Sequence, residues 1–222
     1  ASPRPISTPT PTPTPSGTPT PTPICSPSVN LLQDGGFEMT NGGSNPSWTA
    51  TASSGTPLCP GLNCGFGAFP HGGNGWIRFD GATDGLTAYS ASVQQILTIP
   101  AGSIATLSYY VKAAAVSSPT NSVLTVSVGG STVQTVNEPS LNDPDYVLRM
   151  VDLSAFADGI PRTLSFNYER PGGSEGSDTL LVDDVAVGIT CGSSMSSISG
   201  RVLTPNGTGM LNAKVVLTDQ MG

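Results

Sequence analysis

The residues of this chain that could perform acid-base or nucleophilic chemistry are few and scattered. The only histidine, His71, stands in a loop rich in glycine and proline, and no serine or cysteine stands in a nucleophile motif. Catalysis of these kinds needs clustered titratable groups with a base within hydrogen-bond reach. The adjacent carboxylates Asp183 and Asp184 fall in a predicted strand, where consecutive side chains point to opposite faces. We therefore predict that the protein is not an enzyme.

Aromatic side chains offer a different chemistry, because an exposed ring can stack against the apolar face of a sugar while polar groups orient it. The candidates are Trp48, Trp76, Tyr89, Tyr146 and Tyr168. Trp76 lies in an alternating run that would turn its ring into the core. Tyr89 and Tyr146 are the candidates that we expect at the surface, and they are the predicted carbohydrate-binding residues.

The four cysteines point to disulfide chemistry. Cys59 and Cys64 bracket a short Pro/Gly loop that a disulfide could close, while Cys25 and Cys191 flank the β-rich region. Four cysteines allow three pairings. We prefer Cys59 with Cys64 and Cys25 with Cys191, because a sandwich with adjacent first and last strands would make the second pair neighbours. The alternative is a zinc site, which usually needs two close Cys/His pairs that His71 alone cannot complete. Disulfides indicate an oxidising compartment.

The composition limits the partners of the protein. Its 222 residues carry 8 Lys and Arg against 15 Asp and Glu, a formal net charge of −7. Nucleic acids and anionic membrane surfaces are bound by clustered basic residues, so neither partner is expected. No run approaches the roughly 20 apolar residues of a membrane span. Because the chain begins at Ala1 rather than methionine, we expect that an export signal has been removed, and we predict an extracellular or cell-surface location.

Residues 1–24 are dominated by Thr-Pro dipeptides. Proline lacks an amide donor and fixes φ, so this stretch is predicted to form an extended polyproline II linker. At roughly 3.1 Å per residue the linker would reach about 70 Å. Its threonines are candidate O-glycosylation acceptors.

Residues 25–191 show short runs of alternating apolar residues bounded by Gly, Pro, Asn and Asp. The alternation predicts strands near residues 92–99, 105–112, 123–128, 132–136, 163–168 and 179–187. The Gly129-Gly130 dipeptide would turn a hairpin. Helical periodicity is absent apart from a possible single turn at residues 153–156. The predicted fold is therefore all-β, an antiparallel jelly-roll β-sandwich.

Residues 192–222 form a different kind of segment. Residues 198–204 and 213–219 have the alternation of two strands, and Asn206, in the sequence Asn-Gly-Thr, is a candidate N-glycosylation acceptor between them. Two strands alone do not make a stable domain. Their apolar faces must be covered by further sequence, by the main domain or by another molecule.

Several motifs between about residues 29 and 189 resemble the galactose-binding-like jelly rolls, which include the carbohydrate-binding modules of bacterial glycosidases. They are the opening NLLQDGGFE from Asn30 to Glu38, Trp48, the GWIRFDG run from Gly75, and the closing LVDDV from Leu181. The resemblance implies adjacent first and last strands. It also implies a structural calcium ion held by Glu38, Asp183 and backbone carbonyls, since Ca²⁺ prefers oxygen ligands. The alternative is that both carboxylates only accept hydrogen bonds from backbone amides at a sheet edge.

The final segment, residues 197–222, resembles the first two strands of carboxypeptidase-regulatory-like repeats of the immunoglobulin type, whose later strands are absent. Unpaired strand edges are completed by strand addition from a partner. Our first functional hypothesis is a structural or adhesive subunit of a cell-surface fibre or layer, which self-associates through its C-terminal strands. The alternative is a carbohydrate-binding module of a longer secreted protein, with a polysaccharide as its partner.

Overall fold

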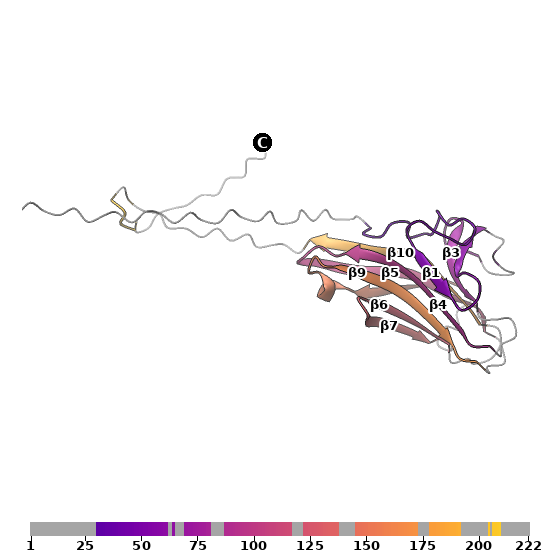
Figure 1. Ribbon diagram of the computed structural model, residues 1–222. Coiled ribbons are helices and arrows are strands. Elements are labelled where there is room, and N and C mark those ends of the chain that lie inside the picture. The colour runs from indigo at the N-terminus through magenta and orange to yellow at the C-terminus, as the bar shows by residue number, and fades with distance from the viewer. Residues whose placement is uncertain are drawn as a thin grey trace, which may run out of the picture. The chain divides into compact units, whose positions relative to one another are not determined.

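The computed structural model describes residues 30–61, 64, 69–80, 87–116, 122–137, 145–172, 178–191, 204 and 206–209. The chain divides into two compact units, residues 1–191 and 192–222. The described part of the first unit consists of two five-stranded antiparallel sheets packed face to face (Figure 1). The predicted all-β jelly-roll sandwich is therefore confirmed.

Each sheet combines strands that are distant in the sequence. The first, which we call the β4 sheet, has the order β1 (Thr49–Ala52), β4 (Tyr89–Thr98), β9 (Pro161–Arg170), β6 (Val123–Val128) and β7 (Ser131–Asn137). The second, the β5 sheet, has the order β2 (Leu58–Pro60), β3 (Gly75–Asp80), β10 (Asp178–Cys191), β5 (Ser103–Val116) and β8 (Val147–Asp152). A single 3₁₀ turn, η3 (Ser154–Phe156), follows β8 at the predicted position.

Period-two alternation builds the core. Along β4 the side chains of Val93 and Leu97 are buried, whereas Ile96 between them is 70% exposed. The inner faces of the two sheets meet through aromatic contacts such as Tyr109 of β5 against Phe166 of β9, whose ring centroids are 5.3 Å apart. Burying each large apolar side chain contributes about 1.5–3 kcal/mol, so the inner faces hold the sandwich together.

The segment before β1 lies beside the last strand, as the resemblance implied. The Leu31 amide donates to the Val187 carbonyl oxygen at 3.0 Å, and the Val185 amide donates to the Gly35 carbonyl oxygen at 2.9 Å. The backbones approach so closely at Gly35 that a Cβ atom there would lie 1.9 Å from the Val185 carbonyl oxygen. Only glycine fits this position.

The predicted disulfide between Cys59 and Cys64 is present. Cys25 and the side chain of Cys191 lie outside the described residues, so the second pairing stays a prediction. The Thr/Pro linker and the two strand-like runs of the tail, apart from Thr204, lie outside them as well. No helix in the part of the chain that the structure describes is long and apolar enough to cross a membrane.

In the second unit the described residues form a tight turn. The Thr204 amide donates to the Thr208 carbonyl oxygen at 2.8 Å, and the Gly207 amide donates to the Thr204 carbonyl oxygen at 2.9 Å. Gly207 has a φ of +79°, which glycine adopts without strain. Asn206 is exposed in this turn, and its glycosylation stays a prediction.

Candidate functional site

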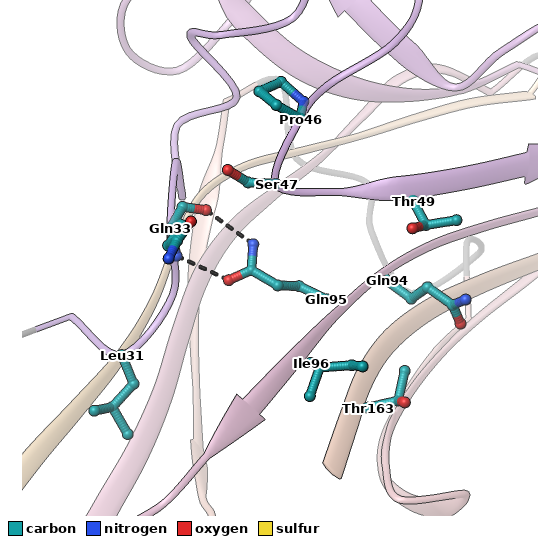
Figure 2. Close-up of a pocket in the computed structure, with 9 residues that line it drawn as sticks. All are labelled: Leu31, Gln33, Pro46, Ser47, Thr49, Gln94, Gln95, Ile96 and Thr163. Atoms are coloured by element: carbon teal, nitrogen blue, oxygen red, sulfur yellow. Dashed lines mark hydrogen bonds between the residues drawn. The ribbon is translucent and has the colours of Figure 1, made fainter. Parts of the chain in front are cut away.

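A groove of about 410 Å³ lies on the outer face of the β4 sheet, beside the segment that precedes β1 (Figure 2). Its walls come from that segment, from β1, from the middle of β4 and from β9. The lining residues are Leu31, Gln33, Pro46, Ser47, Thr49, Gln94, Gln95, Ile96 and Thr163. None of these nine residues is ionisable, so the groove is suited to an uncharged ligand. We call it the β4 groove.

One wall of the β4 groove is fixed by a reciprocal pair of hydrogen bonds. The Gln33 backbone amide donates to Oε1 of Gln95 at 2.8 Å, and Nε2 of Gln95 donates to the Gln33 carbonyl oxygen at 2.9 Å. Figure 2 shows the two bonds side by side. The Gln95 side chain therefore ties the segment before β1 to the sheet.

Other polar groups of the groove are unused. Thr49 of β1 is paired with Gln94 of β4, and Ile96 of β4 with Thr163 of β9, so their outward side chains lie side by side. Among the described residues, the Gln94 amide and the hydroxyls of Thr49 and Thr163 have no hydrogen-bond partner. These groups can donate to and accept from a ligand, while the exposed Ile96 offers an apolar contact.

A second hollow, of about 390 Å³, lies on the same face. Its lining residues are Thr51, Ala52, Ser53, Ser90, Ala91, Ser92, Asn167, Tyr168 and Glu169. Ser90 and Gln94 are four residues apart on β4, which corresponds to about 13 Å along the strand. The two hollows share strands β1, β4 and β9, so the polar surface is elongated along the strands and carries one charged group, Glu169.

The structure places the two predicted sugar-binding tyrosines elsewhere. Tyr89 is 4% exposed, and its ring packs 6.2 Å from that of Tyr168. Its burial corrects the prediction that it forms a surface platform. Tyr146 is half-buried and belongs to the outer side of the β5 sheet, where it packs near Trp76 and Leu181. Neither tyrosine lines the β4 groove.

The two predicted calcium ligands accept hydrogen bonds from backbone amides. Oδ2 of Asp183 accepts from the amides of His71 and Gly72 at 2.8 and 3.0 Å, and Oδ1 accepts from the Asp184 amide at 2.7 Å. The Glu38 carboxylate accepts from Asn74 at 2.9 Å. This arrangement is the alternative left open by the sequence, in which the carboxylates hold the loop between β2 and β3.

In this arrangement backbone N–H donors contact the carboxylate oxygens of both Glu38 and Asp183. Within the described ranges, no group of three or more His, Cys, Asp and Glu side chains could hold a metal ion. Calcium binding stays a prediction, which thermal unfolding with and without Ca²⁺ would test.

The electrostatics of Asp183 follow from its position. The side chain is fully buried, and this desolvation raises its pKa to about 6. The neighbouring Asp184 adds to the rise, while the amides of Gly72, Asp184 and His71 oppose it. Oδ2 of Asp184 forms a hydrogen bond with Nδ1 of His71, and the two atoms are 2.6 Å apart. The single histidine is thus engaged by a carboxylate that helps to hold the loop.

Comparison with solved structures identifies the fold. One similar structure is that of TmCBM61 in complex with β-1,4-galactotriose, with a TM-score of 0.50 and 17% sequence identity over 72% of this chain and 98% of that one. The sandwich has the fold of a carbohydrate-binding module. Two further matches are a family 16 carbohydrate-binding module-2, with a TM-score of 0.44 and 14% identity over 71% of this chain and 99% of that one, and the K1 cleaved adhesin domain of Lys-gingipain from Porphyromonas gingivalis W83, with a TM-score of 0.44 and 15% identity over 71% and 96%.

No protein-family model matches the sequence, and no curated relative matches it either. At these identities the likeness to solved structures concerns the fold alone. The predicted resemblance to galactose-binding-like jelly rolls is confirmed at that level. The predicted repeat at residues 197–222 falls almost entirely outside the described residues.

Proposed function

We propose that the sandwich is a non-catalytic carbohydrate-binding module, that the β4 groove is its binding site, and that it belongs to a longer secreted protein. The observation that carries the proposal is the set of unpaired neutral groups in the groove, on Thr49, Gln94 and Thr163. The fold is compatible with this function. The disulfide between Cys59 and Cys64 supports an extracellular location, because disulfides persist in oxidising compartments.

The chemistry of the groove suits a chain of neutral sugars. The amide of Gln94 offers both a donor and an acceptor, and the hydroxyls of Thr49 and Thr163 offer either. Each neutral hydrogen bond contributes only about 0.5–1.5 kcal/mol, so useful affinity needs several contacts. The second hollow extends the same polar surface along the strands. We therefore favour an extended polysaccharide over a single monosaccharide as the ligand.

Affinity electrophoresis of the full chain through gels that contain polysaccharides tests the proposal. The panel should contain neutral polysaccharides, including a β-1,4-galactan, and charged ones. We expect at least one neutral polysaccharide to retard the protein. Gln94→Ala should weaken that binding about tenfold, since one lost interaction of about 1.4 kcal/mol is a factor of ten. The matched control is Thr190→Ala, an exposed position on β10 away from the groove.

Two results would contradict the proposal. The first is a wild-type protein that no polysaccharide retards. The second is equal retardation of the wild type and Gln94→Ala, which would place the sugar elsewhere on the molecule.

We also keep self-association by strand addition as a second candidate, because one strand edge is suited to it. β8 pairs with β5 on one side, and no described strand pairs with its other edge. Its Leu148 and Met150 are exposed large apolar residues. Light scattering on the full chain and on a version lacking residues 197–222 tests this candidate. Association that persists in the shortened chain would argue against a donor strand in the tail.

A further inference from the structure

The outer face of the β5 sheet is the opposite side of the molecule from the β4 groove, because the two sheets pack through their inner faces. The loop between β2 and β3 lies on this face. Cys59 of β2, Trp76 of β3 and Leu181 of β10 are buried together there, with Tyr146 packed against them. The loop therefore packs on a small apolar cluster that is separate from the main core.

Phe69 in this loop is an exposed aromatic ring on an anchored backbone. The residue is 57% exposed. Its carbonyl oxygen accepts a hydrogen bond from the Tyr146 hydroxyl at 2.8 Å. Two residues further on, the amides of His71 and Gly72 donate to the buried carboxylate of Asp183. The backbone that carries the ring is thus held at Phe69 itself and just after it.

The imidazole of His71 adds a third anchor. It stacks on Tyr110 of β5, with ring centroids 3.6 Å apart and an angle of 15° between the planes, and its Nδ1 contacts Oδ2 of Asp184 at 2.6 Å. A backbone fixed in this way loses little further conformational freedom when a ligand packs on the ring that it carries. Phe69 therefore has the exposure and the preorganisation of a stacking platform.

Polar groups surround the ring of Tyr146, whose hydroxyl holds the Phe69 backbone. His71 and Asp184 are partly exposed, and Nζ of Lys112 lies 5.8 Å from the centroid of the Tyr146 ring. They supply hydrogen-bond donors and acceptors beside an aromatic ring, the combination that recognises a sugar through its apolar face and its hydroxyls together.

We infer that Phe69, together with the His71, Lys112 and Asp184 side chains around Tyr146, forms a second carbohydrate-binding site on the face opposite the β4 groove. The inference rests on the proposed function. Its consequence is that one module holds two polysaccharide chains at once, one on each outer face. The protein would then cross-link polysaccharides as well as bind them.

The test uses the full chain and the neutral polysaccharide that retards it. Turbidity of the mixture reports cross-linking, and titration with a soluble oligosaccharide of the same polymer counts the sites per chain. The wild type should give turbidity and two sites. Phe69→Ala should keep one site and reduce the turbidity at least fivefold, and Phe69→Tyr, which keeps the ring, should restore both.

One further variant separates the Phe69 ring from the hydrogen bond that anchors its backbone. Tyr146→Phe removes only the hydroxyl that holds the Phe69 carbonyl, so we expect a weakened second site with an unchanged first. Ile160→Ala is the matched control, because Ile160 is an apolar residue 55% exposed outside both sites. It should behave as the wild type in both assays.

The outcomes distinguish failure of the second site from failure of the proposed function. If the wild type binds with one site, or Phe69→Ala keeps two sites and full turbidity, the second site is overturned while the β4 groove stands. If no polysaccharide retards the wild type, the proposed function fails and the second site fails with it.

Discussion

The two outer faces of the sandwich use polar side chains in opposite ways. On the β4 sheet, the amide of Gln94 and the hydroxyl of Thr49 face outward without a partner among the described residues. On the β5 sheet, Asp183 spends both carboxylate oxygens on backbone amides, and His71 is engaged by Asp184. The β4 face thus leaves these polar groups unpaired, while the β5 face first uses its polar groups to fix the loop that carries Phe69.

Substitutions on the two faces should therefore affect different properties of the protein, its stability on one face and its sugar binding on the other. Changes on the loop side should lower stability and leave sugar binding in the β4 groove intact. Changes in the groove should lower binding and leave stability intact.

Removal of the Asp183 carboxylate should have the largest effect. Asp183→Ala leaves three backbone N–H groups near the protein interior without their acceptor. Unsatisfied buried groups of this kind cost about 1–3 kcal/mol each, so we expect a loss of about 3 kcal/mol in the free energy of unfolding. Urea denaturation measures it, with Glu169→Gln on the β4 face as the control. A loss below about 0.5 kcal/mol, where ordinary surface substitutions fall, would show that the loop does not depend on this anchor.

Removal of the disulfide should rank second. Cys59→Ser with Cys64→Ser opens a short loop, whose closure contributes about 2 kcal/mol in the chain-entropy model. The melting temperature should fall, while retardation by a neutral polysaccharide through the β4 groove should persist below the melting temperature. Lost retardation in the folded double variant would mean that the two faces are coupled.

A charge in the groove should have a smaller effect, on binding alone. Gln94→Glu keeps the shape of the side chain but removes its two N–H donors and adds a charge that must be desolvated. We expect about tenfold weaker binding of a neutral polysaccharide, or about 1.4 kcal/mol, with an unchanged melting temperature. Binding equal to that of the wild type would remove Gln94 from the site.

A shift of pH should give the smallest effect. Burial raises the pKa of Asp183 to about 6, above the value near 3.9 of an unfolded chain. Protonation therefore favours the folded state, and the stability that it contributes is lost as the pH rises through 6. The free energy of unfolding of the wild type minus that of Asp183→Asn, both measured by urea denaturation, should be larger at pH 5 than at pH 7. The reverse order would show that the amides, rather than burial, dominate the pKa of this carboxyl.

Much of the fold was predictable, because alternation along a strand reports directly which side is buried. Residues 92–99 and 163–168 were expected as strands, and β4 and β9 run from Tyr89 to Thr98 and from Pro161 to Arg170. The disulfide between Cys59 and Cys64 was predicted because these cysteines, five positions apart, bracket a short Pro/Gly loop. Strands β1, β2 and β8 were missed. Strands β1 and β2, with four and three residues, carry too little alternation to be recognised.

The candidate site was harder to predict. Tyr89 was wrongly predicted to lie at the surface. It lies on the same side of β4 as Val93 and Leu97, so extending the alternation of buried residues from Val93 back to Tyr89 would have predicted its burial. The groove itself joins side chains from three strands and a preceding segment, and no local pattern reports which strands become neighbours. The directions of the Asp183 and Asp184 side chains could not be predicted from strand alternation either. Asp184 has a φ of +49°, at a break in the pairing between β10 and β5.

The pairing of the entering segment with β10 has a mechanical consequence. Leu31 is bonded to Val187, and Cys191, the last residue of β10, is only four residues further along that strand. Tension applied to the two ends of the sandwich would pull the entering segment away from β10. The hydrogen bonds between them would then break one after another rather than all at once. A module attached in this way yields at low force unless a covalent link spans the same two segments.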